Sequence, residues 1–197
     1  MKKLVFLIIT CFLLSIPNLA ICEEFTGNVN FFLGVKQLDE DDWEPLEEHD
    51  EYGISLDFKQ KTWPVSIAIG YLSSSDEETV SMYVSGLGTV SFDMEAETTE
   101  LSFGIRKIWD DSPSIRPYIG AGIALISAEA KGSALGVSVS DDDTATGFWL
   151  GAGLYFTISE RFNIGFNFRW SKAEVTLYDV EAEAGGTHYG LLLGIHW

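Results

Sequence analysis

Five charged residues are the main candidates for chemistry, because each interrupts a segment in which large apolar residues recur at every second position. They are Asp57, Lys59, Glu100, Arg106 and Arg169. All five fall on the non-apolar side of their segments. Buried charges are tolerated only when they are paired and hydrogen-bonded. We therefore expect Arg106 and Arg169 to pair with Asp57 or Glu100, in a charge network that is either structural or gates an ion path.

The three histidines give neither a catalytic pair nor a shared metal site. No serine–histidine pair is within reach in the sequence, so a nucleophile would lack its general base. His188 and His196 stand eight residues apart on one expected strand. At roughly 3.3 Å per residue this separates them by about 26 Å, which is too far for one metal ion. We expect no enzymatic activity, no cofactor and no bound metal.

His49 stands inside the acidic run Glu47–Glu51. Histidine and carboxylate side chains together could hold calcium or a transition metal. A solvated acidic loop explains the same composition, and this is the interpretation that we adopt. The acidic triplet Asp141–Asp143 does not begin an EF-hand loop, because the following glycine and the distal glutamate are not in place.

The N-terminal segment has the three-part layout of a secretory signal peptide. A short basic start precedes the apolar run Leu4–Ile16, and Ala20 and Cys22 supply small residues ahead of two glutamates. This predicts a cleaved signal peptide at 1–22 and a single domain at 23–197. Cleavage after Ala20 and lipidation of Cys22 are the alternatives. Both cysteines lie in this segment, so the mature domain is expected to have no disulfide.

Large apolar residues alternate in eight segments of the mature chain, which is the period of a β-strand and not of a helix. We therefore expect eight strands and no helix. Short links follow every second strand, and long polar links follow the others. This alternation is typical of antiparallel up-and-down barrels in outer membranes. The expected strands include Phe25–Val35, Tyr52–Phe58, Val65–Tyr71, Leu101–Ile105, Ile119–Leu125, Phe148–Phe156, Phe162–Trp170 and His188–Trp197. The long links centre on 37–51, 73–98, 131–146 and 178–186.

The second face of each strand decides whether the barrel is apolar outside or inside. That face carries the five charged residues, several asparagines and many of the 19 glycines. Glycine weakens a strand unless close packing needs the space. Inside a narrow eight-stranded barrel, glycines make room for the larger residues Tyr118, Trp149 and Tyr155. We therefore expect the apolar face to contact lipid and the glycine-rich face to line the lumen.

The last expected strand resembles the assembly signal of bacterial outer-membrane β-barrels, because one face ends on an aromatic residue. That face carries Tyr189, Leu191, Leu193, Ile195 and Trp197. Together with the signal peptide, the strand count and the link lengths, it makes residues 25–197 resemble the small eight-stranded outer-membrane proteins. These are the OmpA barrel domain, the OmpX family and, more loosely, OmpW. Phe is the usual terminal residue in such barrels, and Trp197 departs from it.

The resemblance implies an integral barrel in the outer membrane of a Gram-negative-type bacterium, assembled by the barrel assembly machinery and plugged by its lumen side chains. Some eight-stranded barrels are lipid A enzymes, and the deacylase kind uses a His-x-Ser arrangement. None of the three histidines here is followed by serine at that spacing. The resemblance therefore adds no reason to expect catalysis.

The net charge of −18 argues against binding of nucleic acid through its phosphates. Most of the 30 acidic residues fall in the long links. Such loops would repel lipopolysaccharide unless Mg²⁺ or Ca²⁺ bridges them, and they would attract cationic peptides. The stretch Thr79–Asp93 alternates around Gly86–Gly88 and predicts a protruding hairpin whose edges could take up a partner strand.

We therefore predict a non-enzymatic outer-membrane barrel with a structural or surface-interaction role, exercised through acidic extracellular loops. The alternative is a small channel for ions or small apolar solutes. Its lumen would include Phe32, Trp149, Tyr155 and Leu192. The sequence identifies neither the surface partner nor the oligomeric state.

Overall fold

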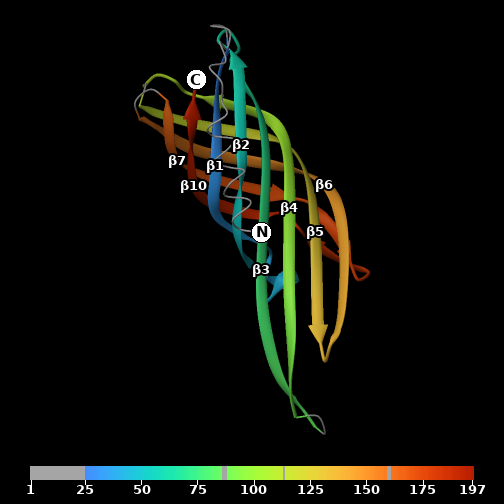
Figure 1. Cartoon of the computed structure of the whole chain (residues 1–197). Coiled ribbons are helices and arrows are strands. Elements are labelled where there is room, and N and C mark those ends of the chain that lie inside the picture. Colours follow the sequence, from blue (N-terminus) through green and yellow to red (C-terminus); the bar gives the residue numbers. More distant parts are fainter. Residues whose placement is uncertain (1–24, 86–87, 113, 159–160) are drawn as a thin grey trace.

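The computed structural model describes residues 25–85, 88–112, 114–158 and 161–197, so the predicted signal peptide at 1–22 lies outside the described residues. Within them, eight antiparallel strands form a closed barrel in the order β1-β10-β7-β6-β5-β4-β3-β2 (Figure 1). The predicted fold class is confirmed. The barrel strands are β1 (Phe25–Gln37), β2 (Glu48–Gln60), β3 (Ser66–Val84), β4 (Gly88–Ile108), β5 (Ile115–Ala134), β6 (Val137–Ile158), β7 (Phe162–Lys172) and β10 (Gly186–His196).

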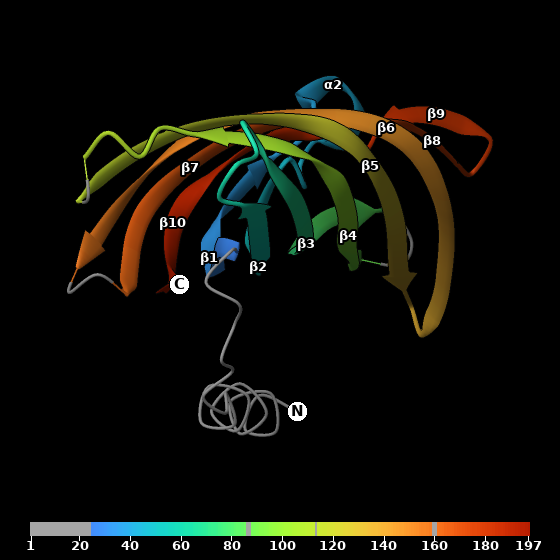
Figure 2. The same ribbon diagram turned by 90° about the horizontal axis from the view of Figure 1, so that it is seen from above.

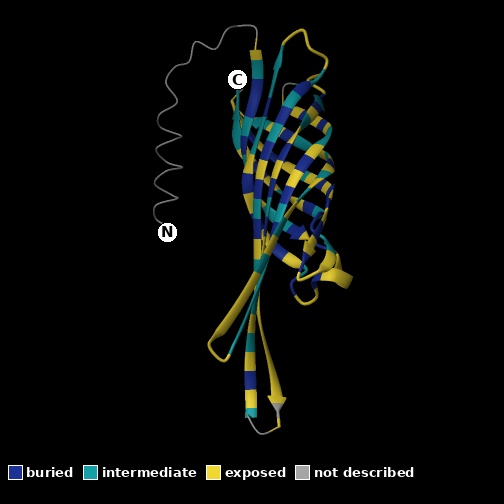
Figure 3. Ribbon diagram, turned by 90° about the vertical axis from the view of Figure 1, so that its right-hand side faces the viewer, coloured by how far each residue is buried: buried dark blue, intermediate teal, exposed yellow. Residues whose placement is uncertain are grey.

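Side chains alternate between the two sides of the barrel wall. On β4, Leu101, Phe103 and Ile105 are exposed on the outer surface, whereas Ser102 and Arg106 are buried in the lumen. The same alternation runs around the barrel and gives the chequered pattern of Figure 3. The wall is therefore apolar outside and polar inside, which is the arrangement of a barrel surrounded by lipid.

Glycines make room for the aromatic side chains that fill the lumen. A Cβ atom at Gly120 would lie 2.9 Å from Cη2 of Trp149, and one at Gly122 would lie 2.8 Å from its Nε1 atom. Tyr118 and Tyr155 stack on each other with ring centroids 4.7 Å apart, and both are buried. The lumen is therefore packed with side chains at this level.

Four neighbouring strands, β3 to β6, continue well beyond the rest of the barrel (Figure 1). β3 and β4 stay paired as far as Val84 and Gly88, and β5 and β6 as far as Ala134 and Val137. β4 and β5 also pair with each other along this length. We call this four-stranded extension, residues 76–97 and 128–147, the protruding sheet.

The protruding sheet confirms one prediction about the long links and contradicts another. The hairpin predicted at Thr79–Asp93 is present, except that 86–87 lie outside the described residues. The loop predicted at 131–146 is wrong, because these residues are the ends of β5 and β6. They are joined at Leu135 and Gly136, which both have positive φ, as a two-residue hairpin turn requires. The apolar residues on one face of this hairpin are small or few, namely Ala130, Ala134, Val137 and Val139, so its alternation is too weak to predict strands.

The other two long links fold over the outer end of the lumen. They contain α2 (Glu40–Trp43) and the hairpin of β8 (Glu174–Leu177) and β9 (Val180–Glu183). We call residues 38–47 and 173–185 the outer cap; in Figure 2 the β8–β9 hairpin lies beside β6. Nε1 of Trp43 donates to the carbonyl oxygen of Glu183 at 2.8 Å and joins the two halves of the cap. Its buried apolar side chains are Leu38, Trp43, Leu46, Ala173, Val175, Leu177 and Ala184.

The presence of α2 corrects the prediction that the mature chain has no helix. The turn begins because a side-chain oxygen of Asp39 accepts a hydrogen bond from the backbone N–H of Asp41 at 3.0 Å. A helix of 4 residues is too short to show a helical apolar period. In the described part of the chain, no helix has the length and apolar character to cross a membrane.

Candidate functional site

Asp57 and Arg106 are the centre of a buried polar network in the lumen. The carboxylate of Asp57 accepts hydrogen bonds from Nδ2 of Asn28 at 2.6 Å, a guanidinium nitrogen of Arg106 at 2.9 Å and the hydroxyl of Tyr155 at 3.1 Å. Arg106 also donates to the hydroxyl of Ser55 at 3.2 Å. Asp57 is fully buried, so its charge depends on these donors in place of water.

Arg169 and Glu100 form a second buried pair, nearer to the outer cap. The guanidinium group of Arg169 donates to the carboxylate of Glu100 and, at 3.1 Å, to the hydroxyl of Ser102. It also lies over the ring of Trp149, with 4.5 Å between its Cζ atom and the ring centroid. Four of the five residues predicted as a charge network therefore form two arginine–carboxylate pairs. Whether these pairs are structural or gate an ion path stays a prediction.

Lys59, the fifth predicted residue, is not brought to the other four. Its Nζ atom lies 3.0 Å from a carboxylate oxygen of Asp110 in the short link after β4. Arg116, which the sequence reasoning missed, occupies the lumen near this end of the barrel. It donates to side-chain oxygens of Asn28 and Asn163, both at 2.9 Å. The alternation of β5 would have predicted an inward position for Arg116, because this residue lies on the face of the strand that points into the lumen.

A third polar group closes the lumen beneath the outer cap. Lys36 is fully buried, and its Nζ atom donates to the hydroxyl of Thr98 at 2.7 Å and to the carbonyl oxygen of Ala184 at 2.8 Å. Nδ1 of His188 lies 2.8 Å from the carboxylate of Glu51. Lys36 thereby ties the cap to β1 through Ala184 and links β1 to β4 through Thr98.

His49 belongs to this closed region, so the prediction that it lies in a solvated loop is wrong. It is fully buried on β2. Its Nδ1 atom lies 3.1 Å from the hydroxyl of Ser74, and its Nε2 atom lies 3.0 Å from the carbonyl oxygen of Leu46. The cap folds back over β2 and covers the ring. Across the described ranges, no group of three or more His, Cys, Asp or Glu side chains is arranged to hold a metal ion.

The protruding sheet is strongly acidic around one lysine. Nζ of Lys131 lies 3.3 Å from Glu129, 3.4 Å from Glu95 and 3.7 Å from Glu97. The hydrogen bond with Glu129 and the nearby carboxylates raise the pKa of Lys131. The lysine therefore stays charged, and the carboxylates around it outnumber it.

The five residues of the predicted assembly signal all lie on the outer side of β10 or directly after it: Tyr189, Leu191, Leu193, Ile195 and Trp197. Trp197 closes the barrel onto β1, because its backbone exchanges two hydrogen bonds with Gly27, each of 3.1 Å. Its indole ring covers Gly27, where a Cβ atom would lie 2.6 Å from Cζ2 of the ring. A role of this face in assembly stays a prediction.

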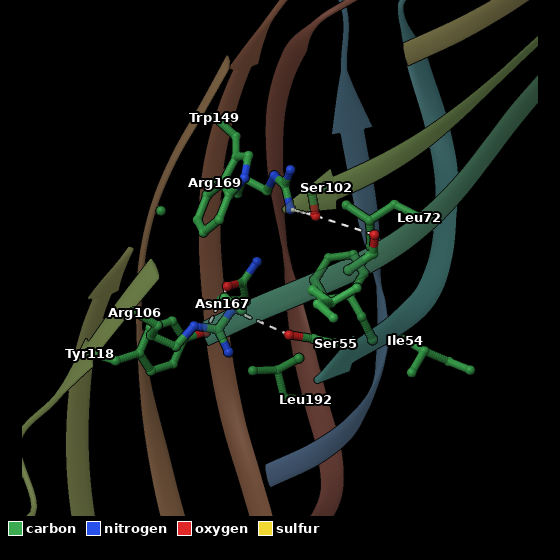
Figure 4. Close-up of a pocket in the computed structure, with 15 residues that line it drawn as sticks. Ile54, Ser55, Leu72, Ser102, Arg106, Tyr118, Trp149, Asn167, Arg169 and Leu192 are labelled. Atoms are coloured by element: carbon green, nitrogen blue, oxygen red, sulfur yellow. Dashed lines mark hydrogen bonds between the residues drawn. The ribbon is translucent and has the colours of Figure 1, made fainter. Parts of the chain in front are cut away.

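Between the two arginine pairs the lumen keeps a cavity of about 20 Å³. Figure 4 shows Arg169 with Trp149 on one side of it and Arg106 with Tyr118 on the other. A space of this size holds one water-sized guest, since a water needs roughly 10–15 Å³. Phe32 and Leu192 line it as well, so two of the residues proposed for an apolar-solute route are packed in the lumen wall.

The closed, lipid-facing barrel agrees with comparisons to known proteins. Residues 8–195 match the family model of the outer membrane protein beta-barrel domain. The chain belongs to this family. It is therefore an integral β-barrel of the bacterial outer membrane, as the sequence predicts. No curated protein matches the sequence.

Solved structures share the fold at low sequence identity. Ail of Yersinia pestis, solved in complex with the heparin analogue sucrose octasulfate, is 16% identical with a TM-score of 0.61, over 88% of this chain and 99% of its own. A major outer membrane protein of Thermus thermophilus is 9% identical with a TM-score of 0.57, over 88% and 98%. OprG of Pseudomonas aeruginosa is 10% identical with a TM-score of 0.52, over 88% and 95%. These neighbours are also outer-membrane proteins.

Proposed function

We propose that this outer-membrane barrel is a non-enzymatic surface-interaction protein. Its packed lumen supports the protruding sheet outside the cell, and the free edge of β3 in that sheet binds extended basic segments of a partner polypeptide. The observation that carries this proposal is the unequal length of the strands, which leaves an edge of the sheet without a partner strand among the described residues.

The free edge begins where β2 stops pairing with β3. The last pair between them is Asp50 with Ser75, whereas β3 continues to Val84 and is paired there with β4 alone. An unpaired edge presents backbone N–H and C=O groups that another strand can use. The residues Asp76–Val84 therefore offer a ready-made template nine residues long.

The charge of the edge selects the partner. Asp76, Glu77 and Glu78 are consecutive at its start, and Asp50 is the last residue of β2 that pairs with β3. A basic segment would be attracted to this edge and an acidic one repelled. The heparin analogue bound by Ail is a polyanion, so by this reasoning the ligand of the present chain carries the opposite charge.

The negative charge of the protruding sheet also determines how it can contact lipopolysaccharide. Glu97, Glu129 and Asp142 lie opposite one another across β4, β5 and β6, beyond the apolar band of the barrel. Lipopolysaccharide is anionic, so its contact with this row would need Mg²⁺ or Ca²⁺ between the two sets of negative charges. We include such bridged contact as part of the proposal.

A synthetic peptide of nine residues, alternating lysine and threonine, tests the proposed edge. We expect it to bind the purified barrel in detergent, and we expect a peptide with prolines at alternate positions to bind at least tenfold more weakly, because proline cannot join a ladder. The triple variant Asp76→Asn, Glu77→Gln, Glu78→Gln should weaken binding. The matched control is Asp39→Asn, Glu40→Gln, Asp41→Asn in the outer cap. Equal binding of both peptides would contradict the proposal.

The alternative, a small channel, has less support from the packing. The outer cap lies over one end of the lumen, and the two arginine pairs and their aromatic neighbours occupy its middle. We therefore give surface interaction precedence over conduction, and a conductance measurement separates the two functions.

A further inference from the structure

The protruding sheet has one polar face and one apolar face. On the outer face, which continues the lipid-facing side of the wall, Thr79 donates to a carboxylate oxygen of Asp93 at 2.8 Å, and the hydroxyls of Ser81 and Ser91 lie 2.9 Å apart. The polar groups of this face therefore have partners within the sheet. The inner face continues the lumen side and is apolar towards its tip, where it carries Val80, Met82, Val90, Phe92, Met94, Ala134, Val137 and Val139.

Part of the apolar inner face is open to water. Val80 and Met82 on β3 are 40% and 52% exposed, and Val137 and Val139 on β6 are 67% and 56% exposed. A contiguous apolar surface of this kind, outside the membrane, marks a contact site. Val80 and Met82 also belong to the free edge Asp76–Val84, so the apolar face and the free edge meet at these two residues.

A strand added at the free edge would place its side chains alternately on the two faces of the sheet. Residues directly opposite one another on neighbouring strands share a face. Partner residues opposite Val80 and Met82 would therefore lie on the apolar inner face, and those opposite Thr79, Ser81 and Tyr83 would lie on the polar outer face. An amphipathic strand matches both faces, whereas a uniformly polar strand leaves Val80 and Met82 in water.

The acidic run at the start of the free edge determines where the partner carries its charge. On β4, the residues directly opposite Asp76, Glu77 and Glu78 are Ala96, Glu95 and Met94. None of these three opposite residues is basic. Lysine or arginine side chains on the other side of β3 would supply the missing opposite charge, since opposite charges on neighbouring strands stabilise their pairing.

We propose that the partner of the free edge is an amphipathic basic strand that runs antiparallel to β3, as β2 and β4 do. It carries apolar side chains opposite Val80 and Met82, and lysine or arginine opposite Asp76–Glu78. Antiparallel pairing is also slightly more stable per residue than parallel pairing. The inference rests on the proposed function, because it gives the sequence pattern of the segment that this edge binds.

Two peptides of equal composition and equal charge test the pattern. The alternating peptide is Val-Thr-Val-Thr-Val-Thr-Lys-Lys-Lys, and the block peptide is Thr-Thr-Thr-Val-Val-Val-Lys-Lys-Lys. Fluorescence anisotropy of labelled peptides measures their binding to the barrel in lipid nanodiscs, with empty nanodiscs as the blank. We expect the alternating peptide to bind about tenfold more tightly, because only its valines all lie on the apolar face.

Two variants on β3 locate the source of this preference. The double variant Val80→Ser, Met82→Ser removes exposed apolar side chains from the inner face, so it should bring the affinities of the two peptides within about twofold of each other. Tyr83→Ser is the matched control, because it removes an exposed side chain from the outer face of the same strand. It should leave the tenfold preference in place.

The outcomes separate this inference from the proposed function. Equal binding of the two peptides, weakened equally by the neutral variant at Asp76–Glu78, would reject the amphipathic pattern and leave the basic partner of the edge in place. A preference that persists in Val80→Ser, Met82→Ser would also reject the pattern. If neither peptide binds, the free edge is not a binding site, and the proposed function fails together with the inference that rests on it.

Discussion

At the scale of single residues, Asp57 shows how the barrel makes a buried charge tolerable. Its three donors come from three different strands: Asn28 on β1, Arg106 on β4 and Tyr155 on β6. The closed barrel wall fixes the positions of these strands. The three donors are therefore held around the carboxylate by the fold and not by the ion pair alone. Removing one partner of such a buried pair is strongly destabilising, because the other charge is then left buried without a partner.

Substitution of Asp57 by alanine should lower the free energy of unfolding by roughly 3–5 kcal/mol, because Arg106 is left as an unpaired buried charge. The matched control is Lys59→Gln, whose pair with the half-exposed Asp110 should contribute about 0–1 kcal/mol. Urea unfolding of the barrel in lipid vesicles measures both. Equal losses in the two variants would show that burial of the pair is unimportant.

The sequence predicts those lumen residues whose position follows from the alternation of their own strand. It does not predict residues whose burial depends on a distant part of the chain. The inward position of Asp57 and Arg106 follows from strand alternation, which the sequence displays. Arg116 obeys the same rule, and only the weak apolar pattern around Pro117 concealed it. His49 could not be predicted, because its burial depends on the fold of the outer cap and not on its own acidic neighbours.

At the scale of elements, the β8–β9 hairpin is held to β6 by carboxylates. Asp143 accepts from the backbone N–H of Thr176 at 2.8 Å, and Asp141 accepts from that of Tyr178 at 2.6 Å. The hydroxyl of Tyr178 donates to the carbonyl oxygen of Ala130 at 3.1 Å. Asp141 and Asp143, two members of the acidic triplet Asp141–Asp143, therefore have a structural role in holding the hairpin.

Docking of this hairpin should depend on pH below about 4. The amides of Thr176 and Thr144 lower the pKa of Asp143 from its ordinary value of 3.8. A lowered pKa in the folded state stabilises docking at pH above the ordinary value, and this contribution disappears as the pH falls through the folded-state pKa. The amide chemical shift of Thr176, followed by NMR from pH 7 to pH 2, measures it.

Two variants control the pH experiment. Asp143→Asn should remove the titration of the Thr176 amide shift, whereas Asp142→Asn should leave it in place. A titration that persists unchanged in Asp143→Asn would show that another group controls the hairpin.

The eight strands and their facing could be predicted because lipid on one side imposes an apolar residue at every second position. The ends of β5 and β6 leave that environment, so within Lys131–Thr146 only Val137 and Val139 keep the pattern, which is too short to predict a strand. The prediction succeeded for Thr79–Asp93, where Val80, Met82 and Phe92 preserve an apolar alternation. Strands in water on both faces are the elements that sequence periodicity detects least well.

At the scale of the whole molecule, the packed lumen and the outer cap should prevent conduction. We expect no discrete current steps when the purified protein is added to a planar lipid bilayer, in a preparation that migrates faster on a gel before boiling than after it. A general porin measured in the same bilayer is the control for insertion. Reproducible openings that change when Arg106 or Arg169 is replaced by glutamate would contradict this prediction and restore the channel alternative.

The unequal strands also give the molecule a mechanical character. From Leu101 at the end of the apolar band to Gly88, β4 runs about 40 Å at roughly 3.3 Å per residue. Four hydrogen-bonded strands share this length as far as Phe92, and β3 and β4 continue as a pair to the tip, so together they act as a lever fixed to one side of the barrel. A load taken up at the tip would tilt the barrel in the membrane before it stretched any loop, and the lipid around the barrel would bear the force.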